Sequence, residues 1–122
     1  MITVEPAKLV RIHLGEDDQW EGRPLYEAIL DRCLQAQIAG ATVYRGIEGF
    51  GASSLIHQPH FLARSADAPI VVTIVDRDEK IQQLLAMLDE LVDDGLIAIS
   101  DVEIVHDGSR ATPPSTRDEQ PH

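Results

Sequence analysis

The stretch APIVVTIVDRDEKIQQLLAMLDELVDDG, residues 68–95, joins a strand pattern directly to a helix pattern. Residues 70–75 form a run without any charged side chain, which predicts a strand that is covered on both faces. Asp76 and Glu79 have the spacing of a helix-capping pair. Apolar residues then recur at helical spacing up to Gly95, namely Ile81, Leu84, Leu85, Leu88, Leu91 and Val92. The stretch therefore predicts a strand over residues 68–76 and a helix that ends at Gly95.

Three further strands and one further helix are predicted on either side of this stretch. Residues 7–15 alternate two sets of side chains with the period of a strand, and residues 41–47 are rich in β-branched and aromatic side chains. Between them we expect a polar loop over residues 15–23 and a helix that begins at Pro24 and stops at Gly40. Residues 96–105 predict the last strand, with a bulge near Ser100 and Asp101, where the alternation slips.

The order of these elements, βαββαβ, predicts an α+β fold of the ferredoxin-like type. In this fold two helices cover one face of a four-stranded antiparallel sheet. On the other face Val71, Thr73 and Val75 would form an apolar patch of a kind that soluble monomers rarely expose, so we expect an oligomer. The alternative is a small patch that Arg11 and His13 on a neighbouring strand interrupt.

Composition narrows the classes of partner. The 122 residues carry a formal net charge of -11, which disfavours nucleic acids and anionic membranes as partners. Cys33 is the only cysteine, so neither a disulfide framework nor a cysteine-based zinc cluster is available. The first residues lack a basic start followed by an apolar run, and no stretch approaches the length of a membrane span, so we expect a cytoplasmic protein without direct membrane insertion. We expect a single domain over residues 1–106 and a disordered tail, rich in Pro, Ser, Thr and charge, over residues 107–122.

The connection over residues 48–67 is far longer than a hairpin needs, and long connections in compact domains are commonly functional or disordered. Gly46, Gly49 and Gly51 at its start could form a mobile hinge or a cradle in which backbone N–H groups bind an anion. Arg45 would be the nearest positive partner of such an anion, and its alternative role is a surface ion pair with an acidic residue.

Two further groups of residues could bind a ligand, and each also has a simpler interpretation. His57 and His60 could bind a divalent metal if the loop turned and other ligands completed the shell, and the alternative is a solvated pair. The acidic residues around Trp20 could bind a hard cation, although a solvated loop is preferred, and Trp20 itself is either a stacking surface or an anchor on the core. No constellation indicates an enzyme, because Ser53 and Ser54 lack an oriented catalytic partner beyond the nearby His57.

Three segments carry a family resemblance. Residues 37–57, QIAGATVYRGIEGFGASSLIH, contain Gly-Ala-Thr-Val, Arg-Gly-Ile, Gly-Phe-Gly and Ser-Ser in succession, and residues 11–30 and 71–105 support the match. Over residues 8–105 the chain resembles an uncharacterised bacterial family of PII-like proteins, related to the PII signal-transduction proteins and to the copper-tolerance protein CutA. The resemblance implies a ferredoxin-like homotrimer.

In PII proteins the corresponding loop begins with Gly-Phe-Gly and shares an intersubunit cleft with a bound adenine nucleotide. Gly49, Phe50 and Gly51 match this beginning. Ala52 and Ser53 stand where PII proteins have Arg and Gln, so the glutamine that helps to hold magnesium and 2-oxoglutarate is missing. The resemblance therefore supports the scaffold more strongly than it supports the PII ligand set.

Two hypotheses follow. The first is a PII-like regulatory protein that binds a small anionic effector at intersubunit clefts, with an adenine nucleotide, with or without magnesium, as the candidate. Residues 48–67 would then respond to the effector and contact a target protein or transporter. The second is a CutA-like trimer that binds metal through His57 and His60, or a purely structural trimer. The ligand-binding residues of the first hypothesis are Arg45, Gly46, Gly49, Phe50, Gly51, Ser53 and Ser54.

Overall fold

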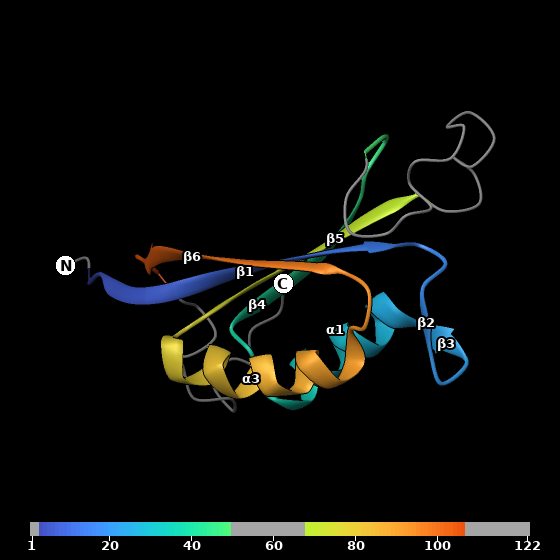
Figure 1. Cartoon of the computed structure of the whole chain (residues 1–122). Helices are drawn as coiled ribbons and strands as arrows, with labels where there is room; N and C mark the ends of the chain where they lie inside the picture. Colours follow the sequence, from blue (N-terminus) through green and yellow to red (C-terminus); the bar gives the residue numbers. More distant parts are fainter. Residues whose placement is uncertain (1–2, 50–67, 107–122) are drawn as a thin grey trace, which may run out of the picture.

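A computed structural model describes residues 3–49 and 68–106 of the chain. These residues form a four-stranded antiparallel sheet with two helices on the same face of it (Figure 1). The strands are β1 (Glu5–Gly15), β4 (Gly40–Arg45), β5 (Pro69–Asp76) and β6 (Leu96–Ile104), and the helices are α1 (Leu25–Gln35) and α3 (Asp78–Leu91). This is the α+β ferredoxin-like arrangement expected from the sequence, and each predicted strand is confirmed to within two residues at either end.

The sheet has the strand order β4-β5-β1-β6, so β1 lies between β5 and β6. Val10 of β1 is opposite Ile74 of β5 and Ile99 of β6. Directly opposed residues of neighbouring strands point to the same face, so the residues opposite Val10 and Ile12 share the sheet face that packs against the helices. Val10 and Ile12 are fully buried there.

The helices contribute the other half of the core. On α3 the buried side chains are Ile81, Leu84, Leu88 and Leu91, which recur at the spacing predicted from the sequence. On α1 the buried side chains are Leu25, Ala28, Ile29 and Cys33. Burial raises the pKa of the Cys33 thiol from 9.0 to about 11, because the apolar surroundings disfavour the thiolate. The core thus lies between one sheet face and the two helices.

Residues 15–23, predicted to be a loop, contain a small hairpin made of β2 (Gln19–Trp20) and β3 (Arg23–Pro24). Its turn is formed by Glu21 and Gly22, with φ values of 50° and 81°. Two successive positive φ angles are typical of the tight turns that match the twist of a hairpin, and glycine adopts them without a steric penalty. The prediction missed the hairpin because its strands are too short to show a period.

The first helix ends earlier than predicted. Gly40 is not the stop, because it already pairs with Val75 as the first residue of β4. Instead Gln37 has a φ of 58°, its N–H donates to the Leu34 carbonyl, and the Ile38 N–H donates to the Cys33 carbonyl. This pair of bonds is the Schellman motif, in which the left-handed position is usually taken by glycine.

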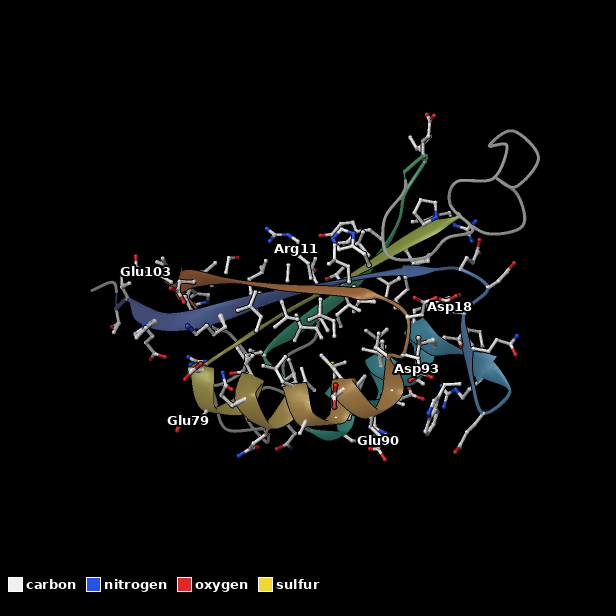
Figure 2. All side chains as sticks on the ribbon, viewed as in Figure 1. Arg11, Asp18, Glu79, Glu90, Asp93 and Glu103 are labelled. Atoms are coloured by element: carbon white, nitrogen blue, oxygen red, sulfur yellow. The ribbon has the colours of Figure 1, made fainter. Side chains whose placement is uncertain are left out.

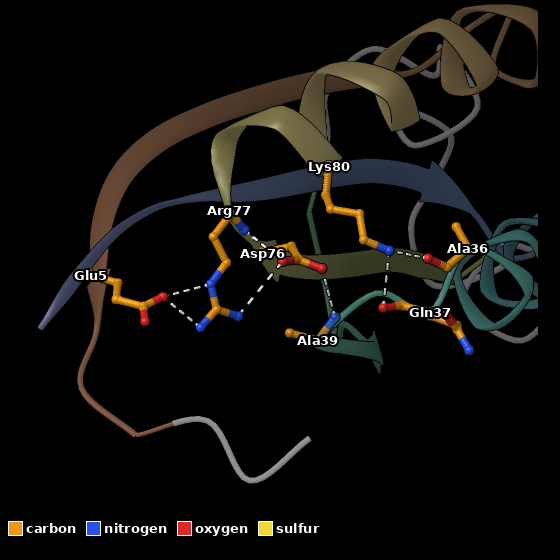
Figure 3. A network of polar contacts seen from close by, with 7 residues as sticks. All are labelled: Glu5, Ala36, Gln37, Ala39, Asp76, Arg77 and Lys80. Carbon is orange, nitrogen blue, oxygen red and sulfur yellow. Dashed lines mark hydrogen bonds and ion pairs between the residues drawn. The ribbon is translucent and has the colours of Figure 1, made fainter. Parts of the chain in front are cut away.

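The predicted capping pair at the start of α3 is wrong. The N-cap is Arg77, which makes no side-chain capping bond, and the helix begins at Asp78. Asp76 is buried as the last residue of β5 and accepts hydrogen bonds from the backbone N–H groups of Ala39 and Arg77 (Figure 3). The carboxylate therefore joins β5 to the start of β4 rather than closing a capping box with Glu79.

Gly95 also has another role than the one predicted. The helix ends at Leu91, with Val92 as its C-cap. A Cβ on Gly95 would lie 2.9 Å from Val92 Cγ1 and 3.1 Å from the His13 carbonyl oxygen. Glycine is required because the chain passes close to the end of β1 as it enters β6.

The predicted bulge in β6 is absent. The register with β1 runs without interruption from Leu96 opposite His13 to Ile104 opposite Glu5. The slip near Ser100 and Asp101 in the alternation of side chains therefore leaves the pairing of this edge strand with β1 unbroken. Asp101 there forms an ion pair with Lys8, which lies opposite it on β1.

The second sheet face carries no element within residues 3–49 and 68–106, as Figure 2 shows for the side labelled by Arg11. Val71, Thr73 and Val75 alternate with the buried residues of β5 and are half-buried on this face. Within residues 3–49 and 68–106, the prediction that β5 is covered on both faces therefore holds only for the helix side. No helix in the described parts is long and apolar enough to cross a membrane. The predicted tail, residues 107–122, lies outside the described residues.

Candidate functional site

The candidate site lies where the chain leaves β4 and later enters β5. Gly46 follows β4 directly, and its N–H donates to the Pro69 carbonyl oxygen at 2.7 Å. A Cβ on Gly46 would lie 3.0 Å from Pro69 Cγ, so the close approach of the two chains favours glycine. Gly46 thus holds the two ends of the long connection together. Its own N–H is already used and is not free for an anion.

Arg45 is the last residue of β4, and its side chain is 60% exposed. Its guanidinium forms an ion pair with the carboxylate of Glu16, whose side chain is 21% exposed. The Glu16 N–H in turn donates to the Ala68 carbonyl oxygen at 2.8 Å. The ends of β4 and β1 are therefore tied together across the start of β5, and the alternative interpretation of Arg45 as a surface ion pair is the one observed.

The acidic segment after β1 forms a turn. The Asp18 carboxylate accepts a hydrogen bond from the Gly15 N–H at 3.0 Å, while the Asp18 N–H donates to the Gly15 carbonyl at 3.2 Å. The Asp18 carbonyl then accepts the Leu25 N–H at 2.8 Å and so fixes the start of α1. Among the residues with described placement, no group of three or more His, Cys, Asp or Glu side chains could hold a metal ion.

Trp20 is an anchor rather than a free stacking surface. Its indole is partly buried and packs against the core. The guanidinium of Arg32 on α1 lies 5.2 Å from the centre of the ring, within the range of a cation–π interaction. Arg23, on the next strand of the hairpin, forms an ion pair with Asp31 of α1 at 2.6 Å. Both contacts fasten the hairpin to the first helix.

Several predicted site residues lie outside the described parts of the chain. These are Phe50, Gly51, Ser53, Ser54, His57 and His60. Their assignment to an anion site or a metal site stays a prediction. Arg45, Gly46 and Gly49 lie together at one end of the sheet, where the long connection begins. Both glycines lie close to the Pro69 side chain.

Two residues at this site were missed by reasoning from the sequence. Glu16 was counted among the acids of a solvated loop, and Pro69 was treated as part of a strand. No local signal marks either residue, because both reach the site through antiparallel pairing over a long distance along the chain. Only the register of β5 against β1 and β4 reveals them.

Solved structures of other proteins share the fold of this chain. Over 87% of this chain and 95% of the other, the fold matches CPII from Thiomonas intermedia K12 bound to ADP and bicarbonate, with a TM-score of 0.63 and 19% identity. A PII-like signaling protein from Thermus thermophilus matches over 84% of this chain and 92% of its own, with a TM-score of 0.57 and 17% identity. The chain thus has the ferredoxin-like fold of PII-like proteins.

The family itself is shown by sequence. The DUF190 family, described as "Uncharacterized ACR, COG1993", matches residues 7–104, and the chain belongs to it. A UPF0166 protein of Aquifex aeolicus is 36% identical over 103 residues, which cover 84% of this chain and 97% of the relative. The UPF0166 protein MJ1524 of Methanocaldococcus jannaschii is 35% identical over 99 residues, covering 80% of this chain and 91% of the relative. The family match, together with the fold shared with PII-like proteins, confirms the resemblance to an uncharacterised PII-like family.

Proposed function

We propose that this protein is a PII-like regulatory protein that binds a small anionic effector, with an adenine nucleotide as the first candidate. The observation that carries the proposal is the end of β4, where Arg45 and the glycines after it lead into the long connection. The fold is shared with CPII, which is bound to ADP and bicarbonate in one solved structure and to ADP, AMP and acetate in another. The shared fold, together with Arg45 and the glycines at the end of β4, supports an effector site there.

The geometry limits how this site would bind an anion. The Gly46 N–H is bonded to Pro69, so backbone donors would have to come from the residues after it. Arg45 is bonded to Glu16, so an incoming phosphate would have to exchange with that carboxylate. The Arg45 side chain is 60% exposed, so a phosphate arriving from solvent could reach its guanidinium and compete with the Glu16 carboxylate for it.

The proposal includes a homotrimer. The sheet face with Val71, Thr73 and Val75 has no cover within the described residues, and burying it against other copies would remove apolar surface from water. Effector sites would then lie between subunits, near the end of β4. Residues 48–67 would pass the bound state on to a target protein or transporter in the cytoplasm. The role is one of binding and signalling rather than catalysis.

The direct test is a nucleotide panel on the full chain. ATP, ADP and AMP, each with and without Mg²⁺, are titrated by calorimetry, and the same ligands are compared by thermal shift. We expect saturable binding of at least one adenine nucleotide and a higher midpoint of unfolding, because a ligand that binds only the folded state stabilises it. GTP and inorganic phosphate serve as controls for base recognition. Absence of any response to every adenine nucleotide would refute the proposal.

A further inference from the structure

A groove between α1 and α3 lies on the helix side of the molecule, away from the end of β4. Its volume is about 290 Å³. Its walls are formed by Arg32 and Gln35 from α1 and by Lys80 and Gln83 from α3, and its apolar part is formed by Leu84 and Met87. No acidic side chain lines it among the described residues, although the whole chain carries 21 Asp and Glu against 10 Lys and Arg.

The two cations of this groove differ from most others in the described parts of the chain. Each of the following has a carboxylate partner: Lys8 with Asp101, Arg23 with Asp31, Arg45 with Glu16 and Arg77 with Glu5. Arg32 and Lys80 form no ion pair with a carboxylate within residues 3–49 and 68–106. In so acidic a chain, two cations without carboxylate partners that meet in one groove are an unusual arrangement.

The local contacts hold both cations in place. The Arg32 guanidinium lies over the Trp20 ring, 5.2 Å from its centre, and a guanidinium carries five N–H donors that can bind a carboxylate. The Lys80 ammonium donates to the carbonyl oxygens of Ala36 and Gln37 at the end of α1 (Figure 3). An ammonium has three donors, so one remains for a ligand. Arg32 and Lys80 are half-buried residues, and these contacts restrict their side chains before any ligand arrives.

We propose that this groove binds a small organic carboxylate with an apolar tail. The carboxylate oxygens would accept hydrogen bonds from Arg32 and Lys80, and the tail would lie on Leu84 and Met87. The volume suits a chain of a few carbon atoms, since it lies just below the range for drug-sized small-molecule sites. This groove is separate from the proposed nucleotide site. It lies between the two helices that cover one face of the sheet, and none of its lining residues belongs to the end of β4 (Figure 1).

The experiment uses hexanoate as the probe and two matched compounds that each lack one feature. Hexanamide has the tail without the charge, and acetate has the charge without the tail. Each is titrated into the full-length protein at constant ionic strength. Trp20, the only tryptophan of the chain, reports through its fluorescence because it lies under Arg32, and backbone amide shifts in NMR spectra report independently. We expect saturable binding of hexanoate with a Kd of about millimolar magnitude and amide shifts confined to α1 and α3.

Variants then separate this site from a general effect of charge. Arg32→Gln and Lys80→Gln should each weaken hexanoate binding by about tenfold, because each removes a hydrogen bond to a charged group. Arg11→Gln is the matched control, since Arg11 also lacks a described carboxylate partner but lies on the opposite sheet face (Figure 2). It should leave binding unchanged. The proposal is overturned if hexanamide binds as well as hexanoate, if both groove variants bind normally by NMR, or if Arg11→Gln weakens binding equally.

Discussion

The carboxylate of Asp76 accepts a hydrogen bond from the backbone N–H of Ala39 at 2.9 Å, which joins the end of β5 to the start of β4. The same carboxylate accepts the Arg77 N–H at 2.6 Å, and the Arg77 guanidinium bonds to Glu5 of β1. Figure 3 shows these groups as one network across three strands. Asp76 is 4% exposed, so its negative charge is stabilised by these donors rather than by water.

Replacing Asp76 tests this network. Asp76→Ala should lower the free energy of unfolding by about 2–4 kcal/mol, because it leaves the Ala39 and Arg77 N–H groups without their acceptor. The measurement is urea unfolding followed by circular dichroism. Glu79→Ala, at the exposed position that the capping hypothesis paired with Asp76, should cost about 1 kcal/mol or less. Equal losses in the two variants would instead favour the capping pair.

Gly95→Ala tests the close approach between the loop after α3 and the end of β1. The added methyl group would lie 2.9 Å from Val92 Cγ1 and 3.1 Å from backbone oxygen at His13, so we expect a loss of about 1–3 kcal/mol. Gly40→Ala is the matched control because nothing lies within 4 Å of the added atom. It should be neutral or stabilising by about 0.4–1 kcal/mol. Thermal unfolding of both variants provides the comparison, and a neutral Gly95→Ala would contradict the structure.

The buried Cys33 thiol predicts a dependence of stability on alkaline pH. Its pKa is about 11 in the folded state against an ordinary value of 9.0, so the unfolded state loses its proton first. The contribution of the neutral thiol is complete below pH 9 and is lost as the pH rises from 9 towards 11. Over that range the loss should reach about 3 kcal/mol.

The check for this prediction compares the wild-type chain with Cys33→Ala. Unfolding free energies are measured for both proteins between pH 7 and pH 10.5, and the difference between them isolates the thiol from other titrating groups. The wild-type advantage should shrink above pH 9. A difference that stays constant throughout would show that the thiol ionises equally easily in the folded and unfolded states.

The proposed trimer can be tested at the sheet face away from the helices. Val71→Glu would place a charge among half-buried residues of β5, and in a trimer that buries this face the charge would lose its water. We expect the wild-type chain to sediment near 40 kDa, three times 13.4 kDa, and the variant to shift towards the monomer. Leu34→Glu is the control, because Leu34 is 72% exposed on α1, on the other side of the molecule. A monomeric wild-type chain would refute the trimer.

The ion pair between Arg45 and Glu16 gives opposite predictions for its two members. Arg45→Gln should weaken nucleotide binding by about tenfold, because it removes the cation from the end of β4. Glu16→Gln should tighten binding by a few fold, since it removes the carboxylate that competes for Arg45. Calorimetry with the nucleotide identified in the panel measures both. If neither variant changes the affinity while the wild type binds, the nucleotide lies elsewhere.

The sequence predicted the parts of this protein that depend on periodicity. The alternation in residues 7–15 and the helical spacing after Asp78 reflect which side chains are buried away from water. Each segment shows its own pattern, so it can be read without the rest of the fold. The strands and helices, their order and the ferredoxin-like fold class were predicted from these patterns. The ends of the helices differ from the prediction. Gln37 took the left-handed position instead of Gly40, and Arg77 became the N-cap instead of Asp76.

Tertiary structure alone decided the partners of polar groups and the reasons for the glycines. Asp76 has the spacing of a helix-capping residue. As the last residue of β5, however, it is buried and accepts a hydrogen bond from the Ala39 N–H. Glu16 becomes the partner of Arg45, and Arg32 and Lys80 meet in one groove, only after pairing and packing bring distant segments together. Hydrophobic burial is non-directional and can be read from a local pattern, whereas a hydrogen bond or an ion pair requires two particular atoms to meet in three dimensions.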